Sequence, residues 1–124
     1  MNEYHGLISR LSSELAPGSL IIDCHSFPSD LADIDICIGY NDDAGKPEQE
    51  MIDKATHLFD RAGFKVGLNN PYSNSITPKK PVDYKSLMIE VNKRCYMNEG
   101  TLARTVGYDI ISGLVNDFYR LVLA

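Results

Sequence analysis

Apolar residues recur along the chain at helical and strand spacings in turn, an order typical of an α/β fold. Residues 3–15 carry apolar side chains every three to four positions, which predicts an amphipathic helix that ends at Pro17 and Gly18. Residues 19–24 form an almost unbroken apolar run, typical of a strand buried on both faces of a sheet. A second strand is predicted at 35–40. The apolar stripe expected on the first helix is Tyr4, Leu7, Ile8, Leu11 and Leu15.

The rest of the chain continues this alternation. A helix is expected from Pro47 to residue 62 and a strand at 64–68, and a strand, a helix and a strand in this order imply a parallel pair. A further strand at 86–94 and a helix at about 100–123, capped by Asn98, complete the pattern. The predicted buried stripes are Met51, Ala55, Leu58, Phe59 and Ala62 on the first of these helices, and Leu102, Val106, Ile110, Leu114, Phe118 and Leu121 on the second.

These elements predict a single domain over residues 1–124, with a three-layer α/β fold in which helices flank a mostly parallel sheet.

The chain has 12 basic and 17 acidic residues and a net charge of −5, which argues against a nucleic-acid-binding surface. Its apolar runs are too short to span a membrane, and its first residues lack the apolar core of a signal peptide, so we expect a cytoplasmic protein. Three cysteines without a CxxC pair favour buried thiols over a disulfide framework.

The first predicted strand ends in side chains that can do chemistry. Strand side chains alternate between the two faces of a sheet, so Asp23 and His25 are expected to point the same way. A histidine at the C-terminal end of a strand, with a carboxylate two residues earlier, is a common arrangement of a metal ligand and the group that orients it. The alternative is a buried histidine held by hydrogen bonds, and this stretch alone does not decide between the two.

Polar residues also occur in the last predicted strand and in the loop before it. The loop at 69–83 is long for so small a domain, and its composition favours a binding loop over a linker. Glu90, Asn92 and Arg94 alternate with their neighbours and are expected on one face of the strand. Burying a carboxylate is costly unless the charge is paired or bound, so Glu90 has either a functional role or a structural partner such as Arg94 or a lysine.

Four motifs follow one another along the chain: Ile-Ile-Asp-Cys-His-Ser-Phe-Pro-Ser (21–29), Asp-Ile-Cys-Ile-Gly (35–39), Asn-Asn-Pro-Tyr-Ser (69–73) and Met-Ile-Glu-Val-Asn-Lys-Arg-Cys-Tyr-Met (88–97). Together they resemble the N-formylglutamate amidohydrolase family. The resemblance implies half of a zinc-carboxypeptidase-like phosphorylase/hydrolase-type fold. It also implies a zinc enzyme that hydrolyses N-formyl-L-glutamate to formate and L-glutamate in histidine breakdown.

Carried over position by position, the resemblance implies a role for each candidate residue. His25 matches a zinc ligand with Asp23 behind it, and Glu90 matches the general base that activates the zinc-bound water. The groups expected to hold a small carboxylate substrate are Asn70, Tyr72, Asn92 and Arg94. The last of these carries a guanidinium fork that can bind both oxygens of a carboxylate.

The chain also departs from the family. Members are much longer, so the chain resembles their C-terminal half. Their other two zinc ligands form a His-x-x-Glu motif, which does not occur in this sequence, whereas catalytic zinc takes three protein ligands. Asn74 stands where many members have glycine, a mild change because asparagine tolerates left-handed backbone.

Two hypotheses about function therefore stay open. The first is a zinc amidohydrolase whose missing ligands come from another chain or an upstream segment. The second is a non-catalytic half-domain that binds a small acidic molecule or a partner chain. In either case half a sheet leaves an unpaired edge, so we expect a homodimer or a complex with an N-terminal-half protein.

Overall fold

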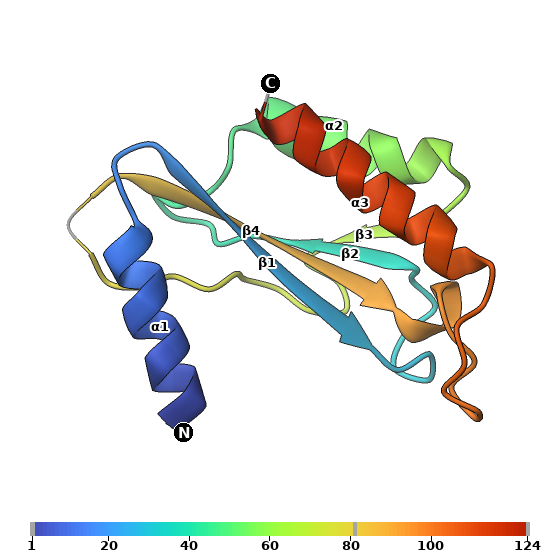
Figure 1. Ribbon diagram of the computed structural model, residues 1–124. Helices are drawn as coiled ribbons and strands as arrows, with labels where there is room; N and C mark the ends of the chain where they lie inside the picture. Colours follow the sequence, from blue (N-terminus) through green and yellow to red (C-terminus); the bar gives the residue numbers. More distant parts are fainter. Residues whose placement is uncertain (1, 81, 124) are drawn as a thin grey trace.

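The computed structural model describes residues 2–80 and 82–123, apart from the side chains of Asn2 and Tyr4, so the predicted role of Tyr4 lies outside the described residues. None of the helices in these ranges combines the length and the apolar character needed to cross a membrane. The elements in chain order are α1 (Asn2–Glu14), β1 (Ser19–Phe27), β2 (Ile36–Gly39), α2 (Gln49–Arg61), β3 (Val66–Leu68), β4 (Tyr84–Asn92), the 3₁₀ turn η1 (Lys93–Cys95) and α3 (Gly107–Leu123) (Figure 1).

The four strands form one sheet in the order β1-β4-β2-β3. β1 is parallel to β4, and β2 is parallel to β3, whereas β2 and β4 are antiparallel. The parallel pair β2 and β3, joined by α2, is the pair that the order of strand, helix and strand predicted. The predicted α/β class with a mostly parallel sheet and flanking helices is therefore confirmed.

Helices α2 and α3 pack on one face of the sheet, and α1 lies on the other side (Figure 1). The core under α2 and α3 is apolar because the side chains of β2 and β4 that face the helices are aliphatic. Phe59 of α2 and Phe118 of α3 are fully buried there, as their helical stripes predicted. The buried residues of this cluster are Ile36, Ile38, Ala55, Phe59, Leu87, Ile89, Val91, Ile111 and Phe118.

The loop of residues 69–80 crosses the opposite face of the sheet (Figure 1). Its backbone touches the strands where these carry glycine: an ideal Cβ on Gly67 would lie 2.4 Å from the Asn70 carbonyl oxygen, and one on Gly39 would lie 2.7 Å from that of Asn74. Asn74 has a φ of 74°, the left-handed conformation that was expected to be tolerated there. The glycines therefore allow the loop to lie flat on the sheet.

We expect Gly67→Ala to destabilise the protein by about 1–3 kcal/mol, because the new methyl group would overlap a backbone carbonyl that cannot rotate away. The measurement is urea unfolding of both proteins. The matched control is Gly113→Ala in α3, where a Cβ would meet nothing within 4 Å. The control should be neutral or stabilising by about 0.5–1 kcal/mol, because alanine favours a helix interior over glycine. Equal effects of the two changes would contradict close packing of the loop.

The start of the last helix differs from the prediction. Asn98 does not cap a helix, because its Oδ1 accepts the N–H groups of Gly100 and Thr101 and closes a local turn. The chain then forms an isolated bridge between Met97 and Arg104, and α3 begins only at Gly107. The predicted buried stripe is accordingly wrong at its first three positions, and Ile111 is buried in their place. The exposed members are Leu102, Val106 and Ile110.

The first strand also differs from its prediction. β1 was expected to be buried on both faces, but it lies at one end of the sheet, and Cys24, His25 and Ser26 are exposed. The apolar run does predict a strand, but it carries no information about which strands are its neighbours. The position of β1 is decided only when β4 pairs with it along its whole length.

Candidate active site

Three side chains on neighbouring strands form a row on the loop-covered face. His25 of β1 and Cys37 of β2 are both register partners of Glu90 of β4, and partners in register project from the same face of a sheet. Nε2 of His25 lies 2.8 Å from Oδ1 of Asp23, so the predicted common face of Asp23 and His25 is confirmed. We call these four residues the His25–Glu90 site.

Glu90 is the unusual member of the site because one oxygen of its buried carboxylate makes no hydrogen bond among the described residues. Its exposed fraction is 7%. Its Oε2 is buried and has no hydrogen-bond partner among the described residues. Burial raises the pKa of Glu90 above its ordinary value near 4.5; the charge of His25 opposes this rise and the carboxylate of Asp23 adds to it. A proton-accepting group of raised pKa in a partly open site is suited to general acid–base chemistry.

The cost of this burial should depend on pH. Well below the ordinary pKa, Glu90 is protonated in both the folded and unfolded states, and burial of the side chain carries no cost of charge. As the pH rises through the raised folded-state pKa, the folded protein must bury a carboxylate, so stability is lost. We expect Glu90→Gln to leave the free energy of unfolding unchanged at about pH 3 and to raise it by about 1–3 kcal/mol at about pH 8.

Urea unfolding of the two proteins at both pH values measures this difference. The matched control is Glu14→Gln, the same chemical change at an exposed position at the end of α1. A Glu90→Gln protein that is less stable than wild type at about pH 8 would show that the carboxylate makes favourable contacts, contrary to this account.

The loop of residues 69–80 forms one wall beside the site. The Cys37 thiol donates to the Tyr72 carbonyl oxygen at 3.2 Å, next to Glu90. The Tyr72 ring meets the Phe27 ring edge-on, with centroids 6.1 Å apart, and its side chain stays 39% exposed. The loop thus carries Asn70 and Tyr72 to the border of the site, where both are exposed, and substrate binding by them stays a prediction.

Asn92 follows Glu90 on the same face of β4, as predicted, whereas Arg94 lies beyond the end of the strand. Asn92 is fully buried, and its amide donates to the carbonyl oxygens of Ile34 and Ala32 at 3.0 and 3.4 Å. β4 ends at Asn92, so the strand alternation that was predicted to carry Arg94 onto the Glu90 face stops before it.

The guanidinium of Arg94 lies 3.0 Å from both Asp33 and Asp35. Hydrogen bonds from Lys65 and from Arg94 lower the pKa of Asp33. The predicted alternative, a structural pair of Glu90 with Arg94, is therefore wrong, because Arg94 pairs with Asp33 and Asp35. Substrate binding by Asn92 or Arg94 stays a prediction, and it would require these internal contacts to be exchanged.

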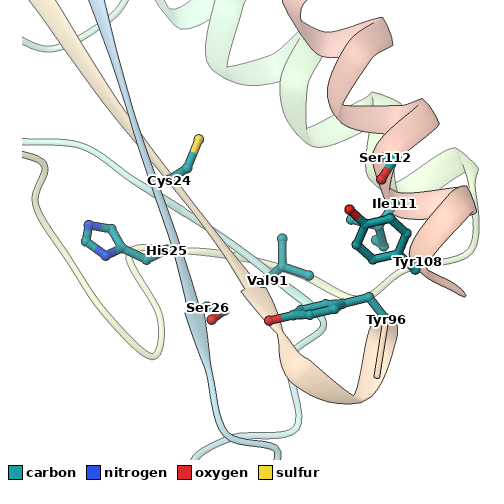
Figure 2. A pocket seen from close by; sticks show the side chains of 8 residues that line it. All are labelled: Cys24, His25, Ser26, Val91, Tyr96, Tyr108, Ile111 and Ser112. Atoms are coloured by element: carbon teal, nitrogen blue, oxygen red, sulfur yellow. The ribbon is translucent and has the colours of Figure 1, made fainter. Parts of the chain in front are cut away.

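A separate groove of about 350 Å³ lies on the helix-covered face beside β1. Figure 2 shows Cys24, Val91, Tyr96 and Tyr108 on the side of α3, whereas the imidazole of His25 points to the other side of β1. The groove therefore opens away from Glu90. His25 also borders the groove, but its imidazole is turned away from it, toward the face that carries Glu90.

Sequence reasoning missed the contribution of Cys37. Its position in an apolar strand predicted a buried thiol, and it is buried. Its place next to Glu90 follows only from the antiparallel pairing of β2 with β4, which no local pattern indicates. The acidic pair Asp33 and Asp35 before β2 was a signal for the ion pairs with Arg94, but their pairing likewise depends on the strand order.

Comparison with known proteins points to one kind of enzyme. A sequence model of the family described as N-formylglutamate amidohydrolase matches residues 2–97. The crystal structure of N-formylglutamate amidohydrolase from Ralstonia eutropha JMP134 is similar, with a TM-score of 0.65 and 23% sequence identity. The match covers 96% of this chain and 45% of that chain, so this chain spans less than half of that protein's length. No curated protein sequence matches.

Proposed function

This chain belongs to the N-formylglutamate amidohydrolase family, and on that premise we propose that it carries the general base of an amide-hydrolysing site. The observation that supports this proposal most is the buried Oε2 of Glu90, which has no hydrogen-bond partner among the described residues, beside His25 and Asp23. A buried charge without a partner is costly to the fold, so its presence in a partly open site favours a functional role. The proposed substrate is N-formyl-L-glutamate, and the proposed setting is histidine breakdown in the cytoplasm.

In the proposed reaction, water attacks the formyl carbon of the substrate. Glu90 accepts a proton from the water as the new C–O bond forms, and it donates this proton to the amide nitrogen as the C–N bond breaks. The remaining hydroxyl proton also passes to the amine, so the products are formate and L-glutamate with an ammonium group. The raised pKa of Glu90 makes it a stronger base than an exposed carboxylate. Asp23 fixes the orientation of the His25 imidazole next to this proton transfer.

The zinc ion implied by the family needs donors that the described residues do not supply. Residues 2–80 and 82–123 contain no group of three His, Cys, Asp or Glu side chains that could hold a metal ion. Catalytic zinc takes three protein ligands, so the residues present do not fit a complete zinc site. We propose His25 as one ligand of a site whose other donors lie outside the described residues, and none of the steps above depends on that metal.

The test is formate release from N-formyl-L-glutamate with added zinc. The 124-residue chain is assayed alone and after co-expression with the part of the Ralstonia eutropha protein that it does not match. We expect little turnover by the chain alone and formate release by the combination. Turnover that does not depend on Glu90 would contradict the proposal.

A non-catalytic half-domain is the second candidate. This candidate is favoured by the ion pairs of Arg94 with Asp33 and Asp35. Arg94 is the cation expected to bind the carboxylate of the substrate, and these pairs already occupy its guanidinium. Metal analysis of the purified complex separates the two candidates. Stoichiometric zinc together with formate release supports the enzyme, and binding of glutamate without zinc or turnover supports the half-domain.

A further inference from the structure

The loop of residues 69–80 is bonded to the sheet face that it crosses (Figure 1). At its start, Asn69 donates its N–H to the Ile38 carbonyl oxygen at 2.8 Å. The side chain of the same residue makes a second bond, because its Oδ1 accepts the N–H of Tyr40 at 2.9 Å. The loop therefore begins at a fixed position beside the end of β2.

The next bond to the loop comes from Cys37. The side chain of Cys37 is fully buried, and its thiol donates to the Tyr72 carbonyl oxygen at 3.2 Å. Burial raises the pKa of this thiol, and the carboxylate of Glu90 adds to the rise, whereas hydrogen bonds with the backbone of Tyr72 and Asn70 oppose it. The thiol therefore stays protonated at neutral pH and keeps the proton that it donates to the loop.

Asn41 and Ser86 hold the residues that follow. The Asn41 amide bonds twice to the backbone of Ser75: Nδ2 donates to the carbonyl oxygen at 3.1 Å, and Oδ1 accepts the N–H at 3.2 Å. Ser86 of β4 is fully buried, and its Oγ donates to the Ile76 carbonyl oxygen at 2.6 Å and lies 2.6 Å from Oγ of Ser75. Since these bonds come after Tyr72 in the chain, the loop is held on both sides of Tyr72.

The polar residues on this face of β4 show what the loop satisfies and what it leaves. Ser86, Glu90 and Asn92 alternate along the strand and therefore share the face. Ser86 bonds to the loop, and the amide of Asn92 bonds to the Ile34 carbonyl oxygen. Oε2 of Glu90 has no hydrogen-bond partner among the described residues. The loop thus pairs with β4 at Ser86 and leaves this oxygen of Glu90 available to a bound molecule.

We propose that Cys37, Asn41 and Ser86 are positioning residues, which hold residues 69–76 as a fixed wall of the His25–Glu90 site. Their hydrogen bonds and the close packing of the loop backbone on Gly39 and Gly67 act on the same segment. A segment that is bonded at such short intervals along its length opens only when several contacts break together. The loop is therefore a preformed part of the site and not a lid that closes over a substrate.

A fixed wall has a consequence for binding. Asn70 and Tyr72 stand at the border of the site before any ligand arrives, so little conformational freedom is lost when a ligand binds. This consequence for substrate binding rests on the proposed function, whereas the fixed position of the loop does not.

The first test measures cleavage of the full 124-residue chain by chymotrypsin after Tyr72, whose side chain is 39% exposed. A protease needs a segment that opens locally, so a fixed loop should resist cleavage although the ring is accessible. We expect Cys37→Ala to speed up this cleavage by about tenfold or more, because the change removes the thiol donor. Cys37→Ser should stay within about threefold of the wild-type rate, because a hydroxyl can donate to the same carbonyl.

A second variant acts at a half-buried position, where a change is tolerated more easily than at the buried Cys37. Asn41→Ala removes both bonds to Ser75 and should also speed up cleavage after Tyr72 by about tenfold or more. The matched control is Cys95→Ala, which removes a half-buried thiol that bonds to Asp35 instead of to the loop and should leave this cleavage unchanged. Cleavage after the buried Phe118, measured in the same samples, reports global unfolding.

Two results would overturn the proposal. Rapid cleavage of the wild-type chain after Tyr72, without cleavage after Phe118, would show that the loop opens on its own. Equal rates for Cys37→Ser and Cys37→Ala would show that the hydrogen bond of Cys37 does not hold the loop.

The second test asks whether the fixed wall acts on substrate binding. In the complex that releases formate, Cys37→Ala should raise KM for N-formyl-L-glutamate by about tenfold and change kcat less, because the loop would hold the substrate and Glu90 would move the proton. Cys37→Ser should restore KM, and an equal KM for all three proteins would overturn this role of the wall. If the wild-type complex released no formate, the proposed function would be wrong, and cleavage after Tyr72 would still decide whether the loop is fixed.

Discussion

Glu90→Gln should lower the rate of formate release by the complete complex by about 10²–10⁴-fold, the range for loss of a general base. Glutamine has the shape of glutamate but cannot accept the proton of the attacking water. The fold should persist, because Oε2 of Glu90 makes no hydrogen bond among the described residues that the change could break. The measurement is kcat for N-formyl-L-glutamate, with circular dichroism and metal content recorded on the same samples.

The control for this experiment is Glu99→Gln. Glu99 is also a carboxylate near the end of β1, where it accepts the N–H of Ser29 at 3.1 Å, but it lies outside the His25–Glu90 site. We expect the kcat of the Glu99→Gln protein to stay within about threefold of the wild-type value, since Glu99 accepts no proton in the reaction. If Glu90→Gln were as active as Glu99→Gln, Glu90 would be a structural residue and the proposed mechanism would be wrong.

Asn92→Ala should lower the free energy of unfolding by about 2–4 kcal/mol. The amide of Asn92 is completely buried, donates to the carbonyls of Ile34 and Ala32, and accepts the N–H of Arg94 at 3.0 Å. Alanine would leave these groups without their partner inside the protein and would also leave a cavity. The measurement is urea unfolding at neutral pH.

Asn116→Ala is the matched control for Asn92→Ala, because Asn116 is exposed on α3. We expect a change within about 0.5 kcal/mol there. The comparison also tests the role that the family resemblance implies for Asn92. If the Asn92 amide bound substrate and made no internal contacts in the unbound protein, its removal would hardly change the free energy of unfolding. A small change for Asn92→Ala would therefore favour substrate binding over the internal contacts.

The sequence by itself determined which elements form and which motifs carry chemistry. Helical spacing predicted the burial of Phe59 and Phe118, and both are fully buried. Alternation along a strand predicted that Asp23 and His25 share a face, and they are in contact. These inferences succeed because the spacing of side chains along one helix or strand is set by local backbone geometry. The four motifs also indicated the family, which the match over residues 2–97 confirms.

Local patterns failed where other contacts outweigh the spacing of side chains along the chain. Leu102 and Val106 continue a helical spacing, but the hydrogen bonds of Asn98 hold the chain in a turn, and both side chains are exposed. Arg94 continues the alternation of β4, but the strand ends at Asn92, and Asp33 and Asp35 hold the guanidinium instead. In the first case a turn closed by a nearby side chain outweighs the helical spacing, and in the second a contact with residues distant in the sequence outweighs the strand alternation.

The site itself was decided only by the tertiary structure. Pairing β4 between β1 and β2 places His25, Glu90 and Cys37 in one row, although they are far apart in the sequence. The same pairing leaves β1, an apolar strand of central type, at the edge of the sheet. Strand order is set by the total burial and hydrogen bonding of the whole sheet, and no single strand carries that information in its own residues.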